Sequence, residues 1–215
     1  MESTSNNILV TIFFLHCTIG TALLAWWFTN KKSAVLKNFG LGLLGYALGL
    51  AAWSLVVLTK PDNLKPIILL GVVPYLLAHI AFAKAASAKL SAKDTTLMSL
   101  TLLLLVATFI ARTFFFKSEP YFSDRGLLYF GLKSVPVALY IATISVSFLP
   151  AIKAMTAELK NKSLKTIMGV GFTVLYVNSI ILVSAKDDTL LLINGVVLGA
   201  ALFTMWVKAL STPKI

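Results

Sequence analysis

The sequence predicts an all-α membrane protein with seven transmembrane helices. Of its 215 residues, 58% are apolar and only 13% are charged, whereas soluble domains average about 45–50% apolar residues. Seven mostly apolar stretches have roughly the 20 residues needed to cross about 30 Å of hydrocarbon. The connections between them span only about 5 to 12 residues, too few for a folded domain outside the membrane. Residues 1–215 are therefore expected to form one domain.

The first span is expected to be retained, because residues 1–7 contain Glu2 and no Lys or Arg, unlike the basic start of a cleaved signal peptide. Six further spans follow at intervals that leave only short polar connections. The seven are expected at 8–29, 35–58, 66–83, 95–116, 127–152, 164–185 and 189–209.

Proline and capping residues refine several of these helices. Pro74 and Pro136 fall inside the third and fifth spans, where a missing N–H predicts a kink. Residues 91–94 read as a capping box that opens the fourth helix. Asp187 and Asp188 stand where they can cap the seventh helix after a tight turn.

The charged connections predict one orientation in the membrane. The connections on one side contain twelve cations and only two acids, Asp94 and Glu158. The cations are Lys31, Lys32, Lys37, Lys84, Lys89, Lys93, Lys153, Lys160, Lys162, Lys165, Lys208 and Lys214. The connections on the other side contain five cations and six acids. The cations are Lys60, Lys65, Lys117, Arg125 and Lys186, and the acids are Glu2, Asp62, Glu119, Asp124, Asp187 and Asp188. The positive-inside rule therefore predicts that the N-terminus is outside and the C-terminus is cytoplasmic. The basic excess is explained by this orientation and by anionic lipid, so no nucleic-acid partner is expected.

An internal repeat is suggested by two ungapped segments. Residues 67–87 align with 191–211, matching Gly71-Val72-Val73 to Gly195-Val196-Val197. A duplication of this kind predicts a 3+1+3 parallel repeat in which the fourth helix reverses the chain. Chance similarity between apolar segments is the alternative explanation.

Converting position into depth at 1.5 Å per residue brings seven groups into one layer. Each predicted helix contributes one polar or amphipathic side chain roughly 6–14 Å below the outer surface. These are His16, Trp53, Tyr75, Arg112, Lys133, Asn178 and Asn194. Two stripes with helical spacing are expected to face the interior, namely Lys133, Tyr140 and Ser147, and Thr101, Thr108 and Arg112.

This layer predicts an outward-facing pocket for a small anionic or amphiphilic ligand or lipid. No Asp or Glu falls within a predicted span, so inward-facing Arg112 and Lys133 would need a compensating negative charge. An anionic ligand with a carboxylate or phosphate, a lipid phosphate, or Glu119 and Asp124 of the outer loop could supply it. His16, Asn178 and Asn194 would hydrogen-bond the ligand, and Trp53 and Tyr75 would wall it. Two other interpretations need no pocket. Arg112 and Lys133 could extend to the outer lipid headgroups, and the polar side chains His16, Asn178 and Asn194 could form hydrogen bonds between helices.

Motifs for chemistry are missing from the sequence. HExxH, GxSxG, Walker A and GxGxxG do not occur, so no enzyme and no catalytic residues are expected. A lone Cys17 provides neither a disulfide nor a CxxC motif. His79 lies too far from His16 in depth to form a bis-histidine site, so neither a metal nor a cofactor is expected.

The run from Lys37-Asn38-Phe39 through small residues to Ala52-Trp53-Ser54 resembles the second helix of the seven-helix N-terminal sensory modules of bacterial histidine kinases and diguanylate cyclases. The resemblance implies a bacterial plasma membrane, ligand sensing in the outer half and output from the cytoplasmic end to a separate protein. The layout also resembles that of 3+1+3 sugar transporters, although no Pro-Gln pair occurs.

We therefore expect a receptor-like sensor. A facilitative transporter is the alternative, and it requires a polar path past Tyr140, Ser147 and Thr204 to the cytoplasm. A structural subunit of a membrane complex, with a protein partner, is the third interpretation.

Overall fold

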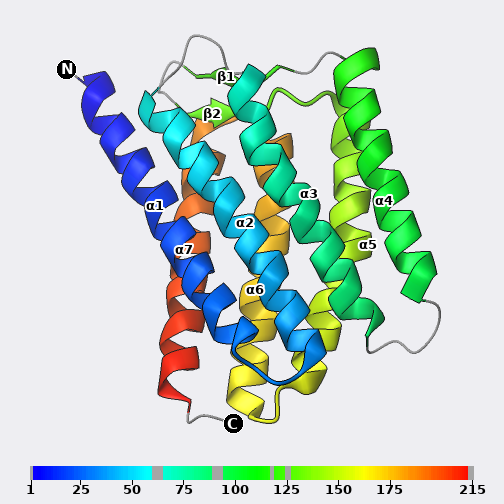
Figure 1. The fold of residues 1–215 in the computed structure, drawn as a ribbon. Helices are drawn as coiled ribbons and strands as arrows, with labels where there is room; N and C mark the ends of the chain where they lie inside the picture. Colours follow the sequence, from blue (N-terminus) through cyan, green and yellow to red (C-terminus); the bar gives the residue numbers. More distant parts are fainter. Residues whose placement is uncertain (1, 60–64, 89–93, 117–118, 124–126, 213–215) are drawn as a thin grey trace.

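The computed structural model describes residues 2–59, 65–88, 94–116, 119–123 and 127–212. The first parts of α1 and α3 are described for their backbone alone. Within these residues the chain forms seven α-helices and one short hairpin (Figure 1). The helices are α1 (Glu2–Thr29), α2 (Ala34–Thr59), α3 (Lys65–Ser87), α4 (Asp94–Ile110), α5 (Ser134–Glu158), α6 (Lys162–Ser184) and α7 (Asp188–Ser211). A π-helical turn, η1 (Ala111–Phe115), continues α4, and β1 (Tyr121–Phe122) pairs antiparallel with β2 (Leu128–Tyr129). The prediction of an all-α fold with seven helices is confirmed for the described part of the chain.

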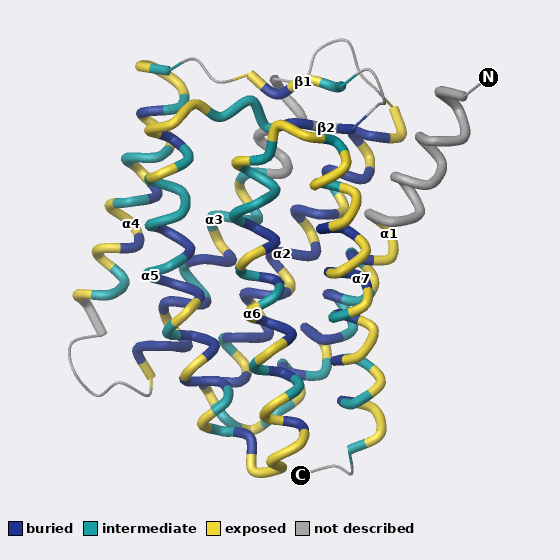
Figure 2. The backbone as a smooth tube through the Cα atoms, turned by 180° about the vertical axis from the view of Figure 1, so that it is seen from behind, coloured by how far each residue is buried: buried dark blue, intermediate teal, exposed yellow. Residues whose placement is uncertain are grey.

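Five segments are long and apolar enough to cross a membrane, counted over the described residues. They are Ala34–Thr59, Thr96–Phe115, Ser134–Glu158, Lys162–Ser184 and Asp188–Ser211. The outward faces of the bundle stay exposed (Figure 2), and they carry large apolar side chains such as Leu103, Phe115 and Val196. An exposed apolar surface of this extent indicates contact with lipid. The chain is a polytopic helical membrane protein.

The helices form two layers that close into a ring. In Figure 1, α1, α2, α3 and α4 make the front layer, with α7, α6 and α5 behind them. Each helix packs against its neighbour in sequence, while α3 also contacts α5 and α1 contacts α7. The N-terminus and the hairpin lie at one end of the bundle, called the hairpin end below, and the last helix finishes at the opposite end.

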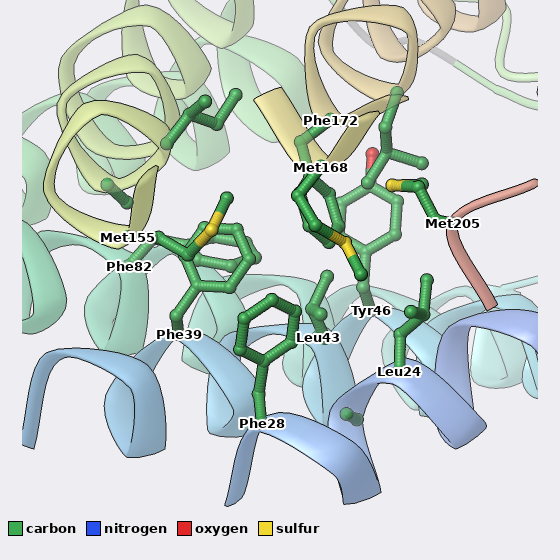
Figure 3. Close-up of a cluster of buried hydrophobic side chains, with 14 of the residues drawn as sticks. Leu24, Phe28, Phe39, Leu43, Tyr46, Phe82, Met155, Met168, Phe172 and Met205 are labelled. Atoms are coloured by element: carbon green, nitrogen blue, oxygen red, sulfur yellow. The ribbon is translucent and has the colours of Figure 1, made fainter. Parts of the chain in front are cut away.

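Five buried phenylalanine side chains, which we call the aromatic cluster, pack together within the main apolar core. Its members, Phe28, Phe39, Phe82, Phe148 and Phe172, come from α1, α2, α3, α5 and α6 (Figure 3 labels four of them). Phe39 lies at the centre, with ring centroids 4.9 Å from Phe172, 5.2 Å from Phe28 and 5.3 Å from Phe82. Edge-to-face and tilted pairs at these distances are favourable.

Glycines let α2 approach α3 closely. A Cβ placed on Gly45 would lie 2.7 Å from the carbonyl oxygen of Pro74 and 3.1 Å from the Ala78 Cβ. A Cβ on Gly49 would lie 2.6 Å from the Tyr75 ring. The small-xxx-small pattern of α2 is therefore used for packing inside the molecule.

The fifth predicted span, 127–152, starts too early. Leu128–Tyr129 is a strand, and α5 begins at Ser134, because Gly131 adopts a left-handed φ of 61° that interrupts a helix. Pro136 is therefore in the first turn of α5, where its missing N–H breaks no helical bond, and the prolines inside helices are Pro74 and Pro150. The kink expected at Pro136 has no basis.

The capping prediction for the seventh helix is confirmed at Asp187, whose side chain accepts a hydrogen bond from the Leu190 N–H at 2.9 Å. Asp188 instead bonds the hairpin, as described below. Three of the four residues of the predicted capping box, 91–93, lie outside the described residues.

Candidate ligand-binding pocket

A pocket of about 90 Å³ lies between the helices in the half of the bundle near the hairpin. Its volume is several times what one water molecule requires. The walls are mainly apolar or aromatic and come from α2 through α6, the residues being Tyr46, Trp53, Val72, Tyr75, Leu76, His79, Leu105, Thr108, Phe109, Arg112, Phe130, Leu132, Tyr140, Leu182 and Val183.

The pocket is elongated along the helices. Two residues of α2 that are seven positions apart, Tyr46 and Trp53, both line the pocket. The same spacing separates Leu105 on α4 from Arg112 on η1. Seven residues correspond to about 10 Å of helix. Arg112 and Trp53 mark the level near the hairpin, and Tyr46 marks the inner level, where it hydrogen-bonds Tyr140.

The hairpin packs over the pocket. Phe130, directly after β2, meets Trp53 edge to face with ring centroids 4.8 Å apart. Leu127 and Tyr129 join Trp53 in a second buried apolar cluster. The hairpin is tied to the start of α7, because the Tyr129 hydroxyl donates to Asp188 Oδ1 at 2.6 Å and Ser123 Oγ donates to Oδ2 at 3.2 Å.

This tie should weaken at alkaline pH. Burial, and then the hydrogen-bonded Asp188 carboxylate, raise the pKa of Tyr129 above its ordinary value of about 10. A raised pKa in the folded state gives a stabilisation that is complete below about pH 10 and is lost as the pH rises through the folded-state value. We expect Tyr129→Phe to be less stable than the wild type at neutral pH, and this difference to shrink above about pH 10. Thermal unfolding from about pH 8 to pH 12 tests this. The exposed neighbour Tyr121 supplies the control, Tyr121→Phe, and a constant Tyr129→Phe difference across the range would contradict the expectation.

The inner end holds a buried polar network. Tyr46 hydrogen-bonds Ser179 on α6 and Tyr140 on α5, and its ring meets Tyr75 edge to face at 4.7 Å. His79 Nδ1 lies 2.9 Å from Ser147 Oγ, which donates its own proton to the Thr143 carbonyl at 2.9 Å. Below this network, Phe82 and Phe148 of the aromatic cluster pack with centroids 4.6 Å apart.

Two polar groups of the pocket have no hydrogen-bond partner in the described structure, and a third has no acidic side chain beside it in the lining. The indole Nε1 of Trp53 and the Nε2 of His79 are buried without a hydrogen-bond partner. Arg112 is half-buried, and no acidic side chain is found among the described residues that line the pocket with it. Unpaired polar groups in an apolar site are costly.

The predicted site residues fall into three groups. Trp53, Tyr75 and Arg112 line the same pocket. His16 is exposed on α1, and Lys133 is exposed just before α5, so neither belongs to the pocket lining.

The two asparagines join α6 to α7. Asn178 Nδ2 donates to the Asn194 carbonyl and Asn194 Nδ2 donates to the Asn178 carbonyl, both at 3.4 Å. Asn194 also borders a separate apolar groove of about 280 Å³ on the outer face of these helices. The asparagines are thus placed as interhelical contacts away from Arg112.

Tyr46 and His79 line the pocket but are not among the residues that the sequence predicts there. The stripe of Tyr140 and Ser147 was the available signal for His79, because Tyr140 lines the pocket and Ser147 bonds His79. Within the described residues, no three His, Cys, Asp or Glu side chains lie close enough together to hold a metal ion.

Comparison with known proteins gives no match to a family model, a curated protein or a solved structure. Function therefore has to follow from the chemistry of the pocket.

Proposed function

We propose that the protein is a receptor-like membrane sensor that binds a small anionic or amphiphilic molecule in this pocket. The observation that carries the proposal is the Arg112 guanidinium, a permanent charge in a mainly apolar lining that supplies no acidic partner among its described residues. A carboxylate or phosphate would provide the missing charge, since guanidinium groups bind both in bidentate fashion. The apolar walls would hold the hydrocarbon part of the ligand.

The closed inner end supports a sensor over a facilitative transporter. A transport path would have to continue past Ser147, but Ser147 is buried beside the aromatic cluster and bonded to His79. Thr204, the next polar group considered for such a path, is exposed on α7 and bonds only its own helix at Ala200. The described side chains therefore support a pocket that ends within the bundle.

The proposed orientation places the hairpin end outside and the opposite end in the cytoplasm of a bacterial cell. The described connections and helix ends away from the hairpin carry nine lysines against two acids, Asp94 and Glu158. The lysines are Lys31, Lys32, Lys37, Lys84, Lys153, Lys160, Lys162, Lys165 and Lys208. Under the positive-inside rule this end is cytoplasmic, so the pocket would collect its ligand from outside and any output would go to a cytoplasmic or membrane protein partner.

The ring order also supports the proposed 3+1+3 repeat. A twofold axis along the membrane normal would exchange α1 with α5, α2 with α6 and α3 with α7. It would then exchange the α3–α5 contact with the α7–α1 contact, and both are present. The fourth helix packs against α3 and α5 outside this relation.

The proposal is tested by titrating hexanoate, a small amphiphilic carboxylate, into the full-length protein in lipid nanodiscs and measuring binding by calorimetry. Replacing Arg112 by Gln is expected to weaken hexanoate binding about tenfold or more, because hydrogen bonds to charged groups contribute about 1.5–3 kcal/mol. Lys186→Gln removes an exposed cation from the same end of the bundle and is the matched control. It should leave the affinity within about twofold. Equal affinities in Arg112→Gln and the wild type would contradict the proposal, and so would a wild type that binds no hexanoate.

A further inference from the structure

The hydrogen bond at His79 Nδ1 determines whether the other ring nitrogen, Nε2, is a hydrogen-bond donor or an acceptor. Ser147 gives its only proton to the Thr143 carbonyl, so the hydrogen in the His79–Ser147 bond belongs to His79 Nδ1. In the neutral imidazole, Nε2 is then an acceptor. That atom is buried and unpartnered, and the His79 side chain is only 1% exposed.

No donor of the described lining, the Tyr75 hydroxyl included, is hydrogen-bonded to this acceptor. Thr108, the one threonine of the lining, donates to the Leu104 carbonyl of its own helix at 2.7 Å. Tyr46 and Tyr140 are engaged with each other, and Tyr46 also with Ser179. The acceptor is therefore left for a donor on a molecule that occupies the pocket.

The other end of the pocket has the opposite character. Arg112 is a cationic donor, and the Trp53 indole N–H is a buried donor without an acceptor, in a side chain 1% exposed. Both lie near the hairpin, and Trp53 is about 10 Å of helix above the level of Tyr46. At the hairpin end, Arg112 and Trp53 thus lack a negatively charged acceptor, and at the inner end His79 lacks a hydrogen-bond donor.

From these two ends we infer the class of ligand, an inference that rests on the proposed function. The pocket binds a short linear carboxylate that carries a hydroxyl group at its far end. The carboxylate accepts from Arg112 and the Trp53 N–H, the chain lies along the apolar walls, and the terminal hydroxyl donates to His79 Nε2. A plain carboxylate leaves the His79 acceptor unpaired, so the site discriminates against it.

The inference is tested by comparing 6-hydroxyhexanoate with hexanoate by calorimetry on the full-length protein in nanodiscs, with empty nanodiscs as the blank. The wild type is expected to prefer 6-hydroxyhexanoate by about tenfold, which corresponds to one buried hydrogen bond. 2-Hydroxyhexanoate, whose hydroxyl is beside the carboxylate, should bind no better than hexanoate. This comparison of isomers needs no variant.

Two substitutions of His79 make the assignment specific. His79→Asn keeps an amide that can donate toward Ser147 but has nothing at the position of Nε2, so the preference should fall to within about twofold. His79→Gln extends an amide to the Nε2 position and should restore part of the preference. Arg112→Gln should weaken both ligands by the same factor.

The outcomes separate the two proposals. Equal wild-type affinity for the two ligands, with both still dependent on Arg112, would mean that water satisfies His79 and would overturn the hydroxyl inference alone. A preference that survives in His79→Asn would also overturn it. If neither ligand shows binding that depends on Arg112, the proposed function falls and the inference falls with it.

Discussion

Replacing Phe39 by alanine is expected to cause a large loss of stability, about 3 kcal/mol in free energy of unfolding. Phe39 is fully buried, and its ring meets Phe28, Phe82, Phe148 and Phe172. In soluble proteins, replacing a buried Phe by Ala lowers the free energy of unfolding by about 3–5 kcal/mol. The lower end applies here because lipid is itself apolar, so the loss comes from the cavity and the missing ring contacts.

The matched control for this substitution is Phe115→Ala. Phe115 is the same residue type in η1 but 76% exposed, so its truncation should change stability by no more than about 0.5 kcal/mol. Unfolding of the detergent-solubilised variants, followed by circular dichroism, measures both. Similar losses in the two variants would mean that the aromatic cluster does not hold the five helices together.

Gly45→Ala is expected to destabilise the protein by about 1–3 kcal/mol, although alanine favours a helix over glycine by about 1 kcal/mol. The new methyl group would lie 2.7 Å from the Pro74 carbonyl oxygen. That oxygen belongs to the backbone of α3, so the two helices would have to move apart.

The same substitution at Gly169 on α6 is the control, because a Cβ there would meet only the Thr156 methyl group at 3.4 Å. Gly169→Ala should therefore be neutral or slightly stabilising. Opposite signs for the two variants in one thermal unfolding assay are the expected result. A Gly45→Ala variant as stable as Gly169→Ala would rule out tight α2–α3 packing.

The helices were predictable because a membrane span requires a long apolar run, and that requirement is visible in the sequence. The hairpin was not predictable in the same way. Its strands have two residues each, too few for an alternating pattern, and its aromatic residues made 127–133 look like the start of a span. The left-handed Gly131 is the physical reason that the helix starts later.

The sequence predicts how deep each site residue lies in the membrane, but not which face of its helix the side chain occupies. Trp53, Tyr75 and Arg112 share both a depth and a pocket, whereas His16 was assigned the same depth and is exposed on α1. Position along a span determines depth, but the face that a side chain occupies depends on how all the helices pack. His79 lies deeper than the predicted layer, so depth alone does not predict its place in a pocket that extends along the helices to reach it.

The closing contact between α1 and α7 determines an order of assembly. Most helix pairs in the bundle are consecutive in sequence, so each helix that leaves the ribosome can dock on the one made just before it. The α1–α7 contact joins two helices that are far apart in sequence, so it cannot form until α7 has been made. Until then, the face of α1 that α7 will cover must be shielded by lipid, and this ring of described helices closes last.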